Sequence, residues 1–190
     1  MSLILLYVFQ WALVLVFLSV FILFCMWTWT SIRAKVPFVP VPNSILDDID
    51  HALHLQEGSV VYDLGCGDAR VLFHSARKHK KVEFIGIENN PFAVLLARVQ
   101  RWWHRRMKRN DVRILQENFF DHDLSRATHI FTYLYPNVMD DLLPKFDKEL
   151  KPGTRLVSTT FQFTQKRPIA EIDLGRGKRQ LARTLYIYEF

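Results

Sequence analysis

An uninterrupted apolar run near the amino terminus constrains this chain more than any other feature. No Lys, Arg, Asp or Glu occurs from Ser2 to Ile32, and Leu3 to about Trp29 consists mainly of Leu, Ile, Val, Phe and Trp. At about 1.5 Å per residue this run would form roughly 40 Å of helix, enough to cross a hydrocarbon layer of about 30 Å with some tilt. The sequence therefore predicts a single N-terminal transmembrane helix.

A signal peptide or a buried core helix would fit this run less well. A secretory signal peptide has a basic n-region, a shorter apolar stretch and a small-residue cleavage site, and none of these is visible here. A buried core helix of this length is rarely apolar on every face. Because Arg33 and Lys35 follow the run and only the α-amino group is charged before it, the positive-inside bias places the C-terminal part on the cytoplasmic (or matrix-equivalent) side.

A proline-rich linker follows the apolar run. Pro37, Pro40 and Pro42 disfavour helix and predict an extended strap that reaches about 30 Å in ten residues. A helix from Asn43 or Ser44, either of which can act as its N-cap, to about Leu55 comes next. We divide the chain into an anchor (1–32), a linker with one helix (33–57) and one folded domain (58–190).

Strands and helices alternate through the folded domain. This pattern is typical of an α/β, doubly wound and largely parallel sheet with helices on both faces. Residues 169–174 and 182–189 flank Gly175-Arg176-Gly177 and predict a closing antiparallel hairpin. The other expected strands are 59–64, 81–87, 112–116, 128–134 and 155–161, and the expected helices are 69–79, 91–108 and 138–150.

The segment Asp63-Leu64-Gly65-Cys66-Gly67 carries the strongest chemical signal. A strand ends in an acid, and Gly-x-Gly then lets the backbone approach a ligand closely. Nicotinamide, flavin and S-adenosylmethionine sites share such a loop. The dinucleotide fingerprint would have a third glycine where Arg70 stands, and Asp63 would repel a pyrophosphate. Asp63 suits S-adenosylmethionine instead, because that ligand carries an amino group and a sulfonium.

Two later strand ends add candidate contacts to the same ligand. Glu88 ends the second strand about twenty residues after the loop, where a carboxylate can accept hydrogen bonds from both ribose hydroxyls. After the third strand, Asn118 can hydrogen-bond the adenine edge and Phe119 can stack on it. The alternatives are an exposed carboxylate for Asp63 or Glu88, a turn residue for Asn118 and a core aromatic for Phe119.

With Asp63–Ala69 and Glu88, the chain resembles the seven-strand (class I) S-adenosylmethionine-dependent methyltransferases. The resemblance implies a Rossmann-like sheet of order 3-2-1-4-5-7-6, with the last strand antiparallel, and S-adenosyl-L-methionine as cofactor. Ala69 departs from it, since many members have a third loop glycine there. The implied cofactor-binding residues are Asp63, Gly65, Cys66, Gly67, Glu88, Asn89, Asn118 and Phe119.

A narrower resemblance comes from the organisation of the chain. An apolar anchor, then Pro37-Phe38-Val39-Pro40, then a helix and the glycine loop resembles the small membrane-anchored protein-lysine methyltransferases. Mitochondrial members of that group act on the c subunit of ATP synthase and on the adenine nucleotide translocase. The same resemblance suggests that Pro37–Pro40 folds over the site as a lid, whereas a spacer is the simpler interpretation.

The segment after the fourth strand is the expected acceptor side. Tyr133, Tyr135 and Asn137 are candidates for lining the acceptor channel, although the two tyrosines can also be ordinary strand residues. Methyl transfer to nitrogen needs no metal and no covalent nucleophile, and the cysteines (Cys25 and Cys66) are too few for a zinc site. The segment lacks the Asp/Asn-Pro-Pro-aromatic motif of enzymes that methylate nucleic-acid amino groups, so nucleic acid is an unlikely substrate.

Residues 98–109 form a basic, aromatic helix end. Arginines alternate there with Trp102 and Trp103, and no acid occurs between Glu88 and Asp111. This composition suits anionic lipid head groups. The alternatives are a solvated face with Trp102 or Trp103 packed inward, or nucleic-acid binding.

Together these features predict a membrane-anchored S-adenosylmethionine-dependent methyltransferase. Its expected substrate is a lysine of a membrane or membrane-adjacent protein, and its expected lipid contacts are residues 3–29 and the helix 98–109. Two alternatives remain open: methylation of a lipid head-group amine or small amphiphile, and a non-catalytic scaffold that retains the fold.

Overall fold

The computed structural model describes residues 3–33, 39–106, 111–175 and 183–190, which belong to two compact units, Met1–Pro37 and Phe38–Phe190. The first unit contains one helix, α1 (Leu3–Arg33). Its segment Leu3–Met26 is long and apolar enough to cross a membrane, with a mean hydropathy of 2.6 and none of it buried. The predicted apolar helix is therefore present, and it continues to Arg33.

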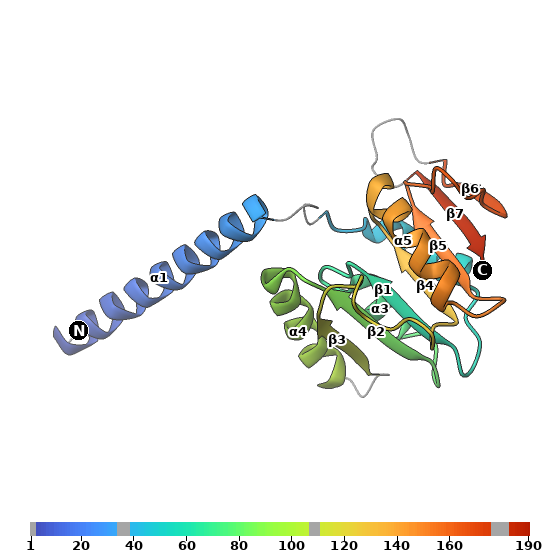
Figure 1. Cartoon of the computed structure of the whole chain (residues 1–190). Coiled ribbons are helices and arrows are strands. Elements are labelled where there is room, and N and C mark those ends of the chain that lie inside the picture. Colours follow the sequence, from blue (N-terminus) through green and yellow to red (C-terminus); the bar gives the residue numbers. More distant parts are fainter. Residues whose placement is uncertain (1–2, 34–38, 107–110, 176–182) are drawn as a thin grey trace. The chain divides into compact units, whose positions relative to one another are not determined.

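The second unit is built on a seven-stranded sheet with strand order β3-β2-β1-β4-β5-β7-β6 (Figure 1). β3, β2, β1, β4 and β5 are parallel, and β7 runs antiparallel to both of its neighbours. The predicted order and the predicted antiparallel last strand are confirmed. The strands are β1 (Val60–Leu64), β2 (Glu83–Glu88), β3 (Val112–Gln116), β4 (His129–Thr132), β5 (Arg155–Thr159), β6 (Ala170–Asp173) and β7 (Thr184–Glu189).

The helices cover both faces of this sheet, unequally. One face packs against α2 (Leu46–Leu53), α3 (Arg70–Ser75) and α4 (Pro91–Arg106), and the other against α5 (Pro136–Glu149) and the β3–β4 connection. Alternation along each strand decides which face a side chain joins: Val61 packs with α3 and α4, and the next residue, Tyr62, packs on the α5 side.

Three helix boundaries differ from the predicted ones. A 3-10 turn (Asn43–Ile45) precedes α2, whose N-cap is Ile45, so neither Asn43 nor Ser44 caps the helix. α3 ends at Ser75 rather than His79. α5 begins at Pro136, because proline fits the first turn of a helix, where its missing N–H is not needed. Arg176 and Gly177 of the predicted hairpin turn lie outside the described residues.

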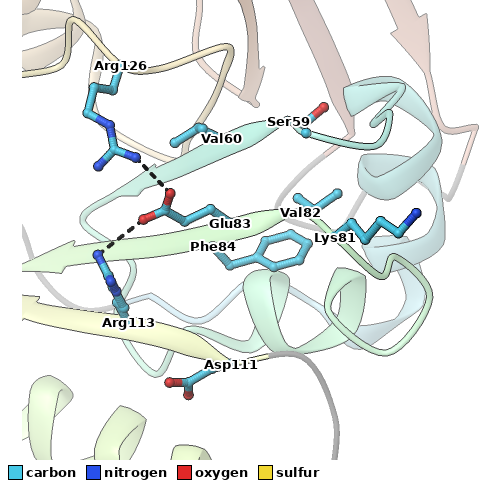
Figure 2. Close-up of a pocket in the computed structure, with 10 residues that line it drawn as sticks. Ser59, Val60, Lys81, Val82, Glu83, Phe84, Asp111, Arg113 and Arg126 are labelled. Carbon is cyan, nitrogen blue, oxygen red and sulfur yellow. Dashed lines mark hydrogen bonds and ion pairs between the residues drawn. The ribbon is translucent and has the colours of Figure 1, made fainter.

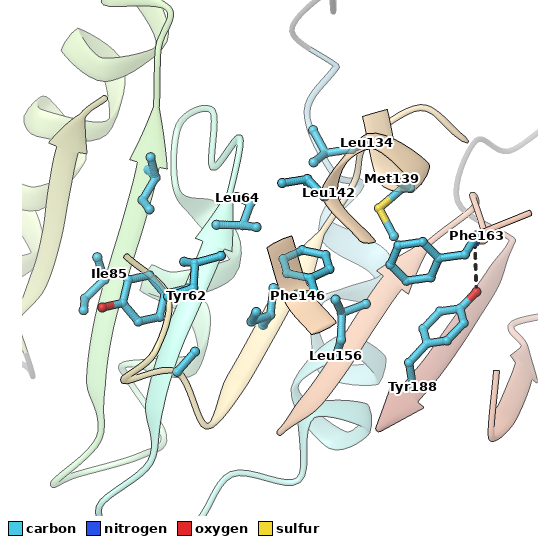
Figure 3. Packing of buried hydrophobic residues seen from close by; sticks show 14 residues of the cluster. Tyr62, Leu64, Ile85, Leu134, Met139, Leu142, Phe146, Leu156, Phe163 and Tyr188 are labelled. Atoms are coloured by element: carbon cyan, nitrogen blue, oxygen red, sulfur yellow. Dashed lines mark hydrogen bonds between the residues drawn. The ribbon is translucent and has the colours of Figure 1, made fainter. Parts of the chain in front are cut away.

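The core on the α5 side joins strands and helix through large apolar side chains (Figure 3). Met139, Leu142 and Phe146 of α5 are fully buried against β1, β4 and β5. At the β7 side of this core, the Tyr188 hydroxyl accepts a hydrogen bond from the Phe163 N–H at 3.1 Å, and the two rings pack edge to face. This packing fixes β7 and the segment after β5 against α5.

Gly86, in the middle of β2, leaves the space that the glycine loop occupies. A Cβ at this position would lie 2.7 Å from the Cys66 Sγ and 3.2 Å from a Leu72 methyl carbon. Such distances are shorter than normal contacts, so any side chain here would force the loop or α3 away from β2.

We predict that Gly86→Ala lowers the free energy of unfolding by about 1–3 kcal/mol, the usual cost of overpacking a core. Cys66→Ala in the same background removes the closest atom and should recover part of this loss. Denaturant unfolding of the wild type, both single variants and the double variant measures the coupling free energy between positions 86 and 66. An equal cost of Gly86→Ala in both backgrounds would contradict the contact.

Candidate functional site

The glycine loop turns the chain from the end of β1 into α3. Gly65 (φ +73°) and Gly67 (φ +57°) both adopt the left-handed conformation that side chains rarely tolerate. The N–H groups of Gly65 and Cys66 donate to the Ile87 carbonyl at 2.8 and 3.1 Å. A Cβ at Gly65 would lie 3.1 Å from the Leu134 side chain. The loop therefore lies over the end of β2 and directly beside the segment that follows β4.

Glu88 holds the second half of this loop in place. One oxygen of its carboxylate accepts the Gly67 N–H at 2.9 Å, and the other accepts the Asn90 N–H at 2.8 Å. Each carboxylate oxygen has a further lone pair. The side chain is only partly buried, so both oxygens can still accept hydrogen bonds from a ligand. Asn89, the next residue, is exposed at the same edge.

Asp63 presents a buried and unbalanced carboxyl group. Its exposed fraction is 3%, and none of the described residues forms a hydrogen bond or an ion pair with its side chain. Burial, together with the nearby carboxylates Glu88 and Asp68, raises the pKa of Asp63 well above its ordinary value. A ligand that brings positive charge here would remove this penalty, because an opposite charge favours the ionised form.

Arg70 does not neutralise Asp63, because it is already paired. Its guanidinium and N–H donate to the Asp68 carboxylate, with a shortest distance of 2.7 Å. The same guanidinium donates to the Val41 carbonyl at 3.0 Å and so connects the linker to the loop. Sequence reasoning missed this role. The lid expected from Pro37–Pro40 stays a prediction, since Pro37 and Phe38 lie outside the described residues.

Cys66 is buried between the loop and β2. Burial, with the carboxylates of Asp63 and Glu88, raises the pKa of the Cys66 thiol well above its usual range. The thiol therefore stays protonated, and its contribution to a ligand site is backbone and shape rather than nucleophilic attack.

Asn118 and Phe119 follow β3 as expected, at the same edge of the sheet as Glu88. The Asn118 side chain stabilises its own turn, accepting the Phe120 N–H at 3.2 Å and donating to Asp121 at 2.9 Å. Phe119 is partly buried against the core on the α5 side. Their roles toward an adenine stay predictions.

Three aromatic rings gather at the carboxyl ends of β4 and β5. The Phe161 ring lies nearly parallel to Tyr133, with centroids 6.2 Å apart, and tilted against Tyr135 at 5.3 Å. We call Tyr133, Tyr135 and Phe161 the aromatic cluster. Burial raises the pKa of Tyr133, so its phenol stays neutral. The structure thus places the two predicted tyrosines together and adds Phe161, whose only sequence signal is its position as the last residue of the expected strand 155–161; the observed strand β5 ends at Thr159.

Asn137, the third predicted residue on this side, is exposed in the first turn of α5. None of the described residues forms a hydrogen bond with its side chain. Its proposed part in lining an acceptor channel stays a prediction.

A hollow of about 610 Å³ lies at the opposite edge of the sheet (Figure 2). Glu83, at the start of β2, binds Arg113 at 3.2 Å and Arg126 at 2.9 Å there. Ligands of parallel α/β sheets bind beyond the carboxyl ends of the strands. The glycine loop and the aromatic cluster lie at that carboxyl edge, so we assign the candidate active site to it. Among the described residues, no group of three or more His, Cys, Asp or Glu could hold a metal ion.

Comparison with known proteins finds a matching family and several similar proteins. The family described as the ANTKMT methyltransferase domain matches residues 63–170. A protein-lysine N-methyltransferase of Saccharolobus islandicus (strain REY15A) is 33% identical over 157 residues, which cover 80% of this chain and 92% of that protein. The adenine nucleotide translocase lysine N-methyltransferase of Mus musculus is 28% identical, over 77% of this chain and only 62% of the mouse protein.

A solved structure matches the folded unit. The chain superposes on an RNA methyltransferase of Salinibacter ruber in complex with S-adenosyl-L-homocysteine, with a TM-score of 0.71 and 32% sequence identity. The match covers 80% of this chain and 93% of that one.

The residues at the carboxyl edge fit the ligand of this family. A cationic amino acid nucleoside complements the buried Asp63, and the Glu88 carboxylate has free lone pairs for hydroxyl groups. The family match covers more than half of the chain, and its range includes the glycine loop and Glu88. The chain belongs to the ANTKMT methyltransferase domain family, and it is a class I S-adenosylmethionine-dependent methyltransferase.

Proposed function

We propose that this enzyme N-methylates a lysine side chain of a protein at or in the membrane that α1 crosses. The observation that carries the proposal is the position of the aromatic cluster, which follows β4 and β5 at the edge that also holds the glycine loop. Leu134 lies between the two tyrosines in sequence and contacts the place where a Gly65 side chain would be. The expected donor and acceptor sides are therefore adjacent.

On the donor side, the carboxyl groups around the glycine loop would favour a positively charged ligand. S-adenosylmethionine, when bound, supplies a methyl group on a positively charged sulfur. Asp63 would bind the amino group of this ligand, and Glu88 would accept hydrogen bonds from its ribose hydroxyls. The Gly67 N–H already orients the Glu88 carboxylate, so little side-chain entropy is lost when the ligand binds.

On the acceptor side, the aromatic cluster would position a lysine amine and exclude water. Aromatic faces attract an ammonium group, and a neutral tyrosine hydroxyl can accept a hydrogen bond from it. The amine must lose its proton before it can attack, while the ordinary lysine pKa is about 10.4. Partial desolvation and the neighbouring sulfonium charge would lower that pKa and so favour the neutral, reactive amine, against the attraction of the aromatic faces for the ammonium form.

The charges near the site disfavour a polyanionic acceptor. Asp63, Asp68 and Glu88 surround the glycine loop, and Arg70 is paired with Asp68. An RNA backbone would be repelled here, since nucleic-acid binding depends on neutralising phosphates with Lys and Arg. The Salinibacter relative is nevertheless an RNA methyltransferase by name, which makes RNA one of the substrates to test.

The anchor would confine the enzyme to one membrane face. α1 contains a 24-residue apolar window with no charged residue, and Arg33 ends the helix. Positive charge at one end of a transmembrane helix favours the cytoplasmic side. We therefore place the catalytic unit on the cytoplasmic (or matrix-equivalent) side, as a single-pass membrane protein.

One labelling experiment tests substrate and sidedness together. S-adenosylmethionine with a labelled methyl group is added to right-side-out and inside-out vesicles that contain the full chain, and protein, lipid and added RNA are then separated. We expect label in protein lysine, and in inside-out vesicles only, because the charged donor does not cross the bilayer. Label confined to lipid or to RNA would contradict the lysine assignment, and label in right-side-out vesicles would contradict the topology.

We predict opposite effects of Asp63→Asn on stability and on cofactor affinity. Because the folded-state pKa of Asp63 is raised, the free energy of unfolding of the ligand-free protein falls as the pH rises from the unfolded pKa to the folded pKa, and the loss is complete above the folded pKa. Near neutral pH, Asp63→Asn should raise the free energy of unfolding of the ligand-free protein by about 1–3 kcal/mol. It should weaken S-adenosylmethionine binding about 10- to 100-fold, because a charge-assisted hydrogen bond is lost.

Calorimetry and denaturant unfolding across pH measure both effects. Wild-type affinity should rise with pH through the folded Asp63 pKa, whereas the affinity of the variant should be flat there. Asp147→Asn, an exposed carboxylate on α5, is the matched control and should change neither quantity. Unchanged affinity in Asp63→Asn would contradict the assigned role.

We predict that Phe161→Ala separates acceptor from donor binding. Removing the central ring of the aromatic cluster should raise the KM for the protein substrate and lower kcat/KM at least about tenfold, since misplacement of a reacting group is costly. Affinity for S-adenosylmethionine should stay within about twofold. Steady-state kinetics with a lysine-containing substrate, beside Phe161→Tyr as the conservative variant, checks this. A loss of cofactor binding equal to the loss of kcat/KM would contradict an acceptor role.

A further inference from the structure

α4 has a second apolar face, which points away from the sheet. Leu95, Val99, Trp102 and Trp103 recur at helical spacing and are 42–56% exposed. Three arginines border them on the same helix: Arg98, Arg105 and Arg106, all exposed. We call these seven residues the α4 outer face.

The inner face of the same helix is already buried against the rest of the folded unit. Ala93, Val94 and Ala97 are buried toward β2, β3 and α3, and the buried His104 ring packs on Phe73 with centroids 5.1 Å apart. The alternative in which Trp102 or Trp103 packs inward is wrong, because His104 occupies the inward position at this end. The tryptophans are therefore not required for the core.

The side chains of the α4 outer face contact one another and form an amphipathic surface. Trp102 and Trp103 meet edge to face at 4.9 Å, and the Arg106 guanidinium lies 4.0 Å above the Trp102 ring. Arg98 and Arg106 have no carboxylate partner among the described residues, whereas Arg101 is paired with Asp111 at 2.8 Å and Arg105 lies 3.9 Å from the same carboxylate. The face thus combines exposed indole and aliphatic groups with uncompensated positive charge.

We propose that the α4 outer face lies in the head-group layer of an anionic bilayer, as a second membrane contact besides α1. Indole rings prefer the interface between water and hydrocarbon, aliphatic side chains such as Leu95 and Val99 bury at the acyl boundary, and arginines bind lipid phosphates. The charge of the face complements an anionic surface. These features together favour a lipid surface over a purely apolar protein groove.

The short connection to α1 supports a bilayer as the occupant. α1 ends at Arg33 and the described part of the folded unit begins at Val39, so residues 34–38 can span at most about 20 Å. If α1 crosses a membrane, as in the proposed function, the folded unit stays close to that surface at a high effective concentration. Even a weak lipid contact is then populated, and it would restrict how the active site approaches its substrate.

A site-specific label on the full chain tests this contact. Val99→Cys is made in a Cys25→Ala background, where the remaining Cys66 is buried with a raised thiol pKa and reacts poorly. The control is Asp147→Cys on α5, which packs on the opposite face of the sheet. Each carries an environment-sensitive fluorophore, and the chain is reconstituted in vesicles of phosphatidylcholine alone or with about 30% phosphatidylglycerol, with or without brominated acyl chains.

We expect the Val99 label to shift to the blue in anionic vesicles and to be quenched by brominated lipid at least twofold more than the α5 label. Equal exposure of both labels to aqueous iodide would overturn the proposal. Protection that grows with the number of chains per vesicle would overturn it in favour of a self-interface. Protection that appears only when RNA is added would overturn it in favour of nucleic-acid binding.

A charge reversal provides the second measurement. Arg98→Glu with Arg106→Glu should remove at least half of the Val99 quenching, whereas the matched reversal Lys148→Glu with Lys151→Glu should leave it unchanged. Equal effects of the two reversals would contradict lipid binding by α4. Flotation of the full chain with vesicles measures anchoring by α1 separately. If the chain still floats while the Val99 label is exposed to water, the α4 contact alone is overturned. If the chain does not float, the anchoring is overturned.

Discussion

The hydrogen bond from the Gly67 N–H to the Glu88 carboxylate joins the two strand ends on which the active site is built. It adds to the pair of N–H groups, from Gly65 and Cys66, that donate to the Ile87 carbonyl. Together they fix the glycine loop over the end of β2, and Gly86 supplies the room for it. Without this closure the loop could not hold its left-handed turns, and Asp63 would not be enclosed. The backbone geometry of the candidate donor side is thus fixed by contacts within the chain itself.

Electrostatics then gives this geometry its selectivity. Asp63 is enclosed together with two other carboxylates, and the nearest arginine is committed to Asp68 and the linker. This surplus of negative charge suits a cationic donor and disfavours phosphate-rich ligands. The aromatic cluster at the neighbouring strand ends is neutral, which suits an amine that must enter without its proton. In the proposed function, the buried acid would serve the donor side and the neutral aromatic cluster the acceptor side.

The sequence predicted the apolar helix from an uninterrupted apolar run, and the positions of Asp63, Glu88 and the two tyrosines from strand ends and glycine signals that are local in the chain, whereas the sheet order was implied by the family resemblance. It did not predict Phe161, the Arg70 bridge to Val41 or the need for glycine at position 86, since each depends on contacts between distant segments. The start of α2 was wrong for a related reason: Ile45, fully buried, is set by packing, whereas Asn43 and Ser44 matched only a cap preference. The outward tryptophans of α4 likewise depend on His104 filling the inward position.

A crystal structure with S-adenosyl-L-homocysteine would test the account most directly, since this product of methyl transfer keeps the amino group and the ribose of the donor. The account predicts density along the glycine loop, with the ligand's amino group within hydrogen-bonding distance of Asp63 and both ribose hydroxyls on Glu88. Density in the hollow beside Glu83, or a nucleoside at the loop that contacts neither carboxylate, would contradict it.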